Sequence, residues 1–184
     1  IKSGTKITFS PDKTIFSGNK FFNPEKIYDL AKSKAYLFSG VTIDWKAPNI
    51  GENNLNKIPT SERFHFENGL MDLVRSNTAV EYNITNDYFV GEADFKEKFD
   101  LKEKGSIHWC ACFNSYNPVI KSFCNTIPTS EGGTHQTGFL NAIAKGFKSY
   151  LEIIGDKKFS AINKDDVLEI LSSSISVLSL IHIS

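Results

Sequence analysis

The segment NTIPTSEGGTH at residues 125–135 decides the fold, because it is a loop that ends by starting a long amphipathic helix. Gly132 and Gly133 can adopt a positive φ and bring the backbone close to a neighbour. The Thr134 hydroxyl can cap the free amides of the first helical turn. Apolar residues then recur at every fourth position, which predicts one buried helix face before Gly155 ends the helix. The recurring residues are Phe139, Ile143, Phe147 and Leu151.

Strand and helix patterns surround this segment along the whole chain. Alternating or β-branched residues predict strands over 6–9, 41–45, 63–66, 80–84, 88–90, 106–113, 119–124 and 174–178. Capped or periodic stretches predict helices over 24–38, 69–76, 135–154 and 165–171, joined by surface connections over 46–60 and 96–104. The first helix is expected to bury Ile27, Leu30, Ala31, Ala35 and Phe38. Strands followed by helices imply two-layer α/β packing, with a domain boundary near residues 76–78.

Composition and charge limit the possible classes of function. The chain has 184 residues, of which 40% are hydrophobic, so a real core is expected and disorder is not. Lys plus Arg and Asp plus Glu each total 21, and this zero net charge gives no sign of tight nucleic-acid binding. A role on DNA therefore needs a local patch or a partner domain. The candidate patch is Lys145, Lys148, Lys157 and Lys158, for which a solvated helix face is the simpler interpretation.

The cysteines indicate a compartment rather than a site. Cys110, Cys112 and Cys124 are an odd number, and the chain shows neither a signal peptide nor a membrane-spanning run, so a reducing cytosol is expected. Cys110 and Cys112 fall on one face of a predicted strand, which favours buried packing. A zinc site with His108 and His135 is the alternative, but the paired spacing of such sites is missing. We therefore predict no metal site.

Three segments occur in an order and spacing typical of one family. Residues 123–139 contain the Glu-Gly-Gly-Thr-His loop, residues 4–12 read GTKITFSPD, and residues 163–177 contain NKDDV and the strand after it. Together they resemble the B subunits of bacterial type IIA DNA topoisomerases, which are topoisomerase IV and DNA gyrase. The resemblance covers nearly the whole chain, and the short connecting segments favour topoisomerase IV over gyrase.

The resemblance implies an α+β fold with two domains. Residues 1–78 look like the C-terminal part of a GHKL-type ATPase domain, an α/β sandwich. Residues 79–184 look like a two-layer α/β transducer domain that stops before the family's Gln-Thr-Lys loop. The absence of an initiator Met leads us to expect an internal piece of a longer protein. Residues 178–184 depart from the family pattern and receive no functional weight.

The family's cofactors are ATP and Mg²⁺, which the resemblance places mainly on residues outside this chain. Gly4 and Thr5 would reach the nucleotide pocket, where the Thr5 hydroxyl would support adenine; opening an edge strand is their alternative role. His135 is expected to be structural, because no nucleophile has a spacing that points to it. No residue is assigned a catalytic role. The structural loop of the transducer would consist of Gly132, Gly133, Thr134 and His135.

The implied function is to couple ATP binding and hydrolysis to gate closure and DNA strand passage. The isolated fragment is expected to be inactive, since the family's general base, metal ligand and γ-phosphate lysine would lie outside it. Expected partners are DNA, the topoisomerase A subunit and a second B subunit, in the cytoplasm and without a membrane. The alternatives are a non-enzymatic α/β nucleic-acid-binding module and an ATP-operated clamp related to MutL or Hsp90.

Overall fold

Two sheets and their helices make up the computed structural model, which describes residues 4–12, 14–15, 22–47, 58–94, 105–155 and 161–179. The first part contains α1 (Pro24–Leu37), β1 (Thr42–Lys46), β2 (Ser61–His65) and α3 (Leu70–Asn77). The second part contains the 3₁₀ helix η1 (Val80–Tyr82), β3 (Phe89–Asp94), β4 (Gly105–Phe113), β5 (Ile120–Cys124), β6 (Ile127–Pro128), α5 (Thr134–Ile154), α6 (Lys164–Leu168) and β7 (Leu171–Ser179).

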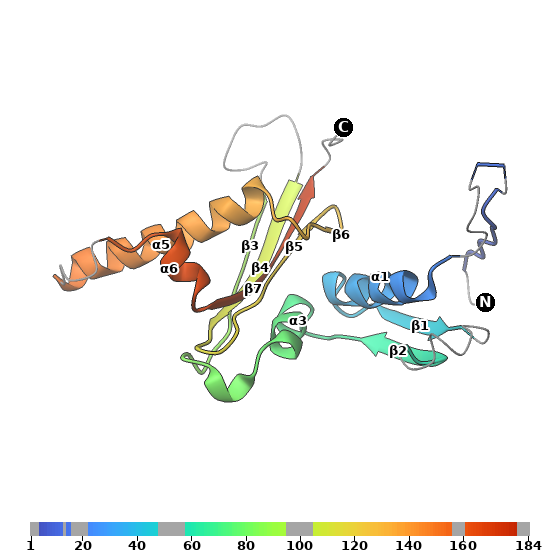
Figure 1. Ribbon diagram of the computed structural model, residues 1–184, viewed down its shortest axis with the longest axis horizontal. Coiled ribbons are helices and arrows are strands. Elements are labelled where there is room, and N and C mark those ends of the chain that lie inside the picture. Colours follow the sequence, from blue (N-terminus) through green and yellow to red (C-terminus); the bar gives the residue numbers. More distant parts are fainter. Residues whose placement is uncertain are drawn as a thin grey trace.

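The larger sheet has five strands in the order β3-β4-β7-β5-β6. Its central strand β7 pairs antiparallel with β4 and parallel with β5. β1 and β2 form a separate antiparallel pair. Figure 1 shows α5 and α6 on one side of the larger sheet, with α1 and α3 on the other.

Strand β4 is covered on both faces, because successive strand residues point to opposite sides of a sheet. Ala111 belongs to the core beneath α5, whereas Cys110 and Cys112 pack against Val74 of α3. The core beneath α5 also contains Phe139, Leu140, Ala144, Val167, Leu171 and Ile175. The expected layers of sheet and long helix are therefore present, and the α+β class is confirmed.

Local capping explains where several helices begin and end. Asn23 Oδ1 accepts a hydrogen bond from the amide of Lys26 at the start of α1, with Pro24 at the first helical position. A capping box at Asn163 starts α6. α5 ends at Gly155, whose φ of 72° lies in the left-handed region that glycine tolerates.

The predicted strand over residues 6–9 is wrong. This segment has no regular secondary structure, and the side chains of Ile7 and Phe9 are exposed. A strand needs a neighbour for its backbone hydrogen bonds. No described residue pairs with this segment, so its alternating sequence alone does not produce a strand.

The predicted strand over residues 80–84 is also wrong, because this segment begins with η1. The side-chain amide of the fully buried Asn114 donates to the carbonyl of Ala79 at 2.9 Å and to Asn83 Oδ1 at 2.8 Å. These bonds hold a 3₁₀ turn in place. Within the turn, the amide of Tyr82 donates to the carbonyl of Ala79, three residues earlier. A distant asparagine thus overrides the local β-branched pattern.

The buried stripe predicted for α1 is only partly present. Ala35 is fully buried and Tyr36 nearly so, but Ile27, Leu30 and Phe38 are more than a third exposed. The main contacts of α1 are with β1, β2 and α3, and they leave these three apolar side chains partly open to solvent.

Strand β7 begins at residue 171, three residues earlier than predicted, and α6 is correspondingly shorter. Ser172, Ser173 and Ser174 are almost completely buried there, although serine favours neither strands nor apolar surroundings. Pairing with β4 along its whole length holds this serine run in the sheet.

Candidate functional site: the glycine loop and the groove beside it

A two-residue turn joins β5 to β6 at the start of the segment over residues 125–135. Asn125 and Thr126 both have positive φ, 49° and 68°, between the paired residues Cys124 and Ile127. Two positive φ values in succession characterise the turns that join twisted antiparallel strands. Threonine is β-branched and rarely adopts this conformation, so the turn is strained at Thr126. The sequence pattern does not indicate this turn, because the turn lacks the glycine that usually marks one.

The backbone of each of the two glycines that follow lies close to a neighbouring side chain, as expected. Gly132 has a φ of 74°, and a Cβ atom there would lie 3.2 Å from Gln136 Oε1. Gly133 has a φ of 158°, and its Cβ would lie 2.9 Å from Cε1 of His135. Both positions therefore favour glycine on steric grounds.

The capping role predicted for Thr134 is wrong. Gly133 is the N-cap residue, Thr134 is the first residue of α5, and no side chain caps this helix. The carbonyl of Gly133 accepts the first helical hydrogen bond, from the amide of Thr137 at 3.0 Å. The helix therefore begins one residue earlier than expected, because the conformation of Gly133 changes the direction of the backbone.

His135 belongs to a group of polar side chains that ties the loop to α5. Its Nε2 lies 3.3 Å from Thr129 Oγ1, which lies 2.6 Å from Ser122 Oγ. The Ser122 hydroxyl also donates to Gln136 Oε1 at 2.9 Å. Burial lowers the pKa of His135, which keeps the imidazole neutral at neutral pH. These contacts hold the loop together, and they are consistent with the structural role expected of His135.

Gly4 and Thr5 lie far from this loop. Both are exposed, and no described atom outside the neighbouring residues lies within 4 Å of a Cβ placed on Gly4. The N-terminal segment lies beyond α1, on the side away from the five-stranded sheet (Figure 1). The structure therefore does not bring the two sets of predicted site residues together.

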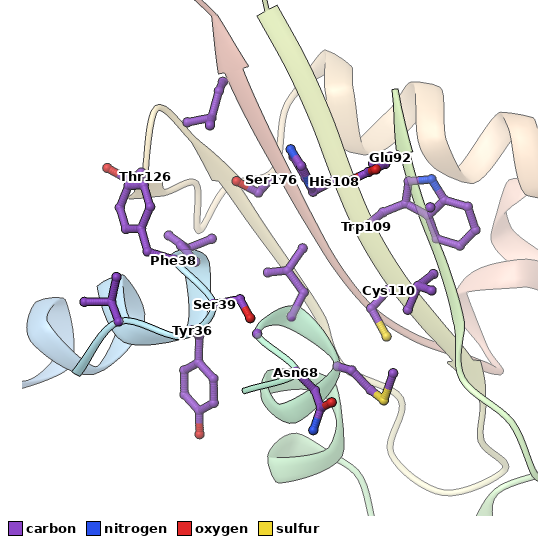
Figure 2. A pocket seen from close by; sticks show the side chains of 18 residues that line it. Tyr36, Phe38, Ser39, Asn68, Glu92, His108, Trp109, Cys110, Thr126 and Ser176 are labelled. Carbon is purple, nitrogen blue, oxygen red and sulfur yellow. Dashed lines mark ion pairs between the residues drawn. The ribbon is translucent and has the colours of Figure 1, made fainter. Parts of the chain in front are cut away.

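A groove with a volume of about 800 Å³ lies where the two parts of the chain meet. Figure 2 shows the end of α1 and the residues before α3 on one side, and strands β3, β4 and β7 on the other. Glu92 and His108 form its polar edge, with Oε2 and Nδ1 3.6 Å apart and both side chains exposed. Thr126 of the strained turn also lines the groove. Sequence analysis missed the groove because its walls come from five separate elements.

Two of the three cysteines are packed in the core rather than arranged for chemistry. Cys110 and Cys112 are fully buried, and burial raises the pKa of Cys110 to about 12 and also raises the pKa of Cys112. A buried neutral thiol is a poor nucleophile and a poor metal ligand. Within the described ranges, no three His, Cys, Asp or Glu side chains are grouped so that they could hold a metal ion.

Part of the predicted lysine patch lines a second hollow, of about 420 Å³, between α5 and α6. Lys145 and Lys148 of α5 face it together with Lys164 and Asp165 of α6. Lys157 and Lys158 fall outside the residues that the structure describes. Three cations and one acid leave this hollow positively charged in a chain of zero net charge.

No helix in the described part of the chain is long and apolar enough to cross a lipid bilayer.

Comparison with known proteins gives a consistent set of relatives. A family model described as DNA gyrase B matches residues 69–180. The B subunit of DNA topoisomerase 4 from Bartonella bacilliformis is 39% identical over 178 residues, which is 97% of this chain and 25% of that protein. The corresponding protein of Rickettsia felis is 39% identical over 95% of this chain and 25% of its own length. The chain thus spans about a quarter of the length of these relatives.

Solved structures show the same architecture. The 43K ATPase domain of Thermus thermophilus gyrase B, in complex with an aminocoumarin, matches with a TM-score of 0.65 at 24% identity, over 91% of this chain and 42% of that one. The topoisomerase IV ATP-binding domain of Francisella tularensis, in complex with a small-molecule inhibitor, matches with a TM-score of 0.60 at 25% identity, over 91% and 41%.

Proposed function

Because this chain belongs to the DNA gyrase B family, we propose that it is the part of an ATP-dependent type II DNA topoisomerase B subunit that links nucleotide binding to gate closure. The longer protein would pass one DNA duplex through another. The family relationship favours this function over the nucleic-acid-binding module and over the clamp related to MutL or Hsp90.

We divide the chain at residue 78, with the end of the ATPase domain before it and the transducer domain after it. The observation that carries the proposed coupling is the apolar contact across this division. Tyr36 of α1 and Leu73 of α3 pack against Phe123 of β5. α1 therefore contacts β5, the strand that leads directly into the strained turn and then into the glycine loop. A displacement of α1 would shift this strand, because close-packed side chains transmit strain.

ATP and Mg²⁺ would bind mainly to the remainder of the subunit. Thr5 is exposed and offers one uncharged hydroxyl, which can hydrogen-bond to adenine or to a bound water. The described residues offer no cluster of metal ligands. We assign adenine support to Thr5, beside Gly4, and give no residue of this chain a role in ATP cleavage.

The longer protein would act in the cytoplasm with three partners. These are DNA, the topoisomerase A subunit and a second B subunit that closes the dimeric gate. The positive hollow formed by Lys145, Lys148 and Lys164 is the described surface best suited to DNA phosphates. Its small size suits a transient contact with a transported duplex better than a stable binding site.

The decisive experiment reconstitutes the full-length B subunit with its A subunit and measures ATP-dependent decatenation, relaxation and supercoiling of DNA. Strand passage that requires ATP supports the proposal, and decatenation stronger than supercoiling assigns the topoisomerase IV type. Leu73→Asp should abolish strand passage, since it places a charge in the contact between α1 and the sheet. The exposed substitution Lys26→Met is the control. Full activity of a folded Leu73→Asp protein would count against coupling through this contact.

A further inference from the structure

The proposed coupling needs a contact that can respond to α1, and the strained turn provides one. Lys34, on the last turns of α1, extends its ammonium group to the hydroxyl of Thr126, which accepts a hydrogen bond from Lys34 Nζ. Thr126 is 9% exposed and Lys34 is half-buried, so the hydroxyl end of this bond is shielded from water. A charged donor from the first part of the chain is thus held by a single hydroxyl of the second part.

The conformation of Thr126 makes this contact more than a surface hydrogen bond. A β-branched residue with a φ of 68° is strained, and such strain persists only where the surroundings enforce it. The bond from Lys34 is an enforcing contact that comes from a distant element. When α1 withdraws, the turn loses this contact and can relax toward an unstrained conformation. A movement of α1 would therefore change the contacts that hold the turn.

The strained turn is joined rigidly to the long helix. The amide of Thr129, just after β6, donates to the carbonyl of Ser122 in β5 at 2.8 Å. Thr129 and Ser122 in turn contact His135 and Gln136 in the first turn of α5. Between Thr126 and this network the chain runs only through Ile127 and Pro128, which form β6. A change in the turn therefore displaces the start of α5 rather than being absorbed in a loose loop.

We infer that Lys34 and Thr126 are positioning residues which transmit the position of α1 through the β5–β6 turn to α5, and so regulate gate closure. The inference rests on the proposed function and adds to it the pair of residues at which the signal crosses. Neither residue touches nucleotide or DNA in this role.

The test uses full-length B subunits labelled with a donor and an acceptor fluorophore, and follows dimer closure after addition of a non-hydrolysable ATP analogue. Lys34→Met and Thr126→Val each remove the bond while keeping the size of the side chain. Each should slow closure about fivefold or more, with analogue affinity changed by less than about twofold. The double variant should be no slower than either single variant, because both remove the same interaction. Lys34→Arg, which keeps a donor, should restore closure.

A second substitution separates coupling from stability. Thr126→Gly removes the strain together with the hydroxyl, so the protein should melt no lower than the parent while closure is slowed as in Thr126→Val. Lys26→Met, at the exposed start of α1, is the matched control and should close normally. Normal closure in folded Lys34→Met and Thr126→Gly proteins overturns this inference alone. A parent protein that shows no nucleotide-dependent closure overturns the proposed function, and this inference with it.

Discussion

The Cβ position of Gly133 lies 2.9 Å from Cε1 and 3.0 Å from Nδ1 of His135, so the imidazole ring occupies the space that any side chain at residue 133 would need. The glycine and the histidine of this loop are thus sterically linked. Their roles in the loop can be tested together.

Gly133→Val should destabilise the second part of the chain by about 1–3 kcal/mol, because the side chain meets the imidazole and the φ of 158° is unfavourable for a β-branched residue. Thermal unfolding of the isolated chain measures this. His135→Ala is the matched control and should cost less, since it removes the hydrogen bond to Thr129 but leaves the backbone unstrained. In the double variant part of the cost should disappear, as the obstructing ring is gone. Equal stability of Gly133→Val and the parent would refute the steric account.

Gly91→Ala should also be destabilising, by about 1–3 kcal/mol, because the indole of Trp109 lies across β3. A Cβ at Gly91 would lie 2.5 Å from Trp109 Cζ2, and Trp109 itself packs against Phe139 of α5 with ring centroids 5.5 Å apart. The indole therefore has little room to move away.

Gly138 provides the control for Gly91. It lies within α5, and no described atom outside the helix backbone is within 4 Å of a Cβ placed there. Gly138→Ala should stabilise the chain by about 1 kcal/mol through helix propensity. Urea unfolding of both variants measures the two changes in stability. A Gly91→Ala protein as stable as Gly138→Ala would show that Trp109 yields easily.

The pH dependence of stability should carry a contribution from His135. Its folded pKa is lowered by burial, so the unfolded chain binds the proton more readily. Stability from this group is present above the unfolded pKa and is lost as the pH falls below it. Between pH 7.5 and pH 5, roughly spanning the ordinary pKa of histidine, the parent should lose more stability than His135→Gln. If the stability of the two proteins falls equally with pH, His135 does not cause the pH dependence.

Sequence reasoning succeeded where the signal was local and failed where a distant residue decided the conformation. α5, its end at Gly155 and the cap at Asn23 follow from residues adjacent in the chain. η1 depends on Asn114, more than thirty residues away, and the serine run of β7 is held by pairing with β4. The Lys34 contact to Thr126 joins residues 92 positions apart. Periodicity and propensity contain no information on such contacts.

The same distinction applies to the candidate site. The glycine loop was identifiable because its residue types carry a specific backbone requirement. The groove was not identifiable, since Phe38, Asn68 and His108 meet only through the packing of α1 and α3 beside the sheet. Their positions in the sequence follow neither the helical period nor the strand period. The positive φ of Thr126 was not predictable either, because threonine is not a residue that indicates such a turn.

The isolated chain should release no phosphate from ATP above a blank without protein. The described residues provide no cluster of metal ligands. A steady-state assay with Mg²⁺ measures this, and the reconstituted full-length protein is the positive control. Release that a substitution within this chain abolishes would show that the chain contains catalytic residues which we have not assigned.

Thr5→Val in the full-length protein tests the one nucleotide contact assigned to this chain. Valine keeps the shape of threonine but removes the hydroxyl, so polar groups around adenine lose a partner. The expected cost is about 1–3 kcal/mol, or a roughly 5- to 150-fold weaker nucleotide affinity, measured by calorimetric titration. Thr5→Ser, which keeps the hydroxyl, is the control and should bind nearly as the parent does. Because Thr5 is exposed here, any effect must come from elements of the longer protein that pack over it. Equal affinities for parent and Thr5→Val would return Thr5 to the role of opening an edge strand.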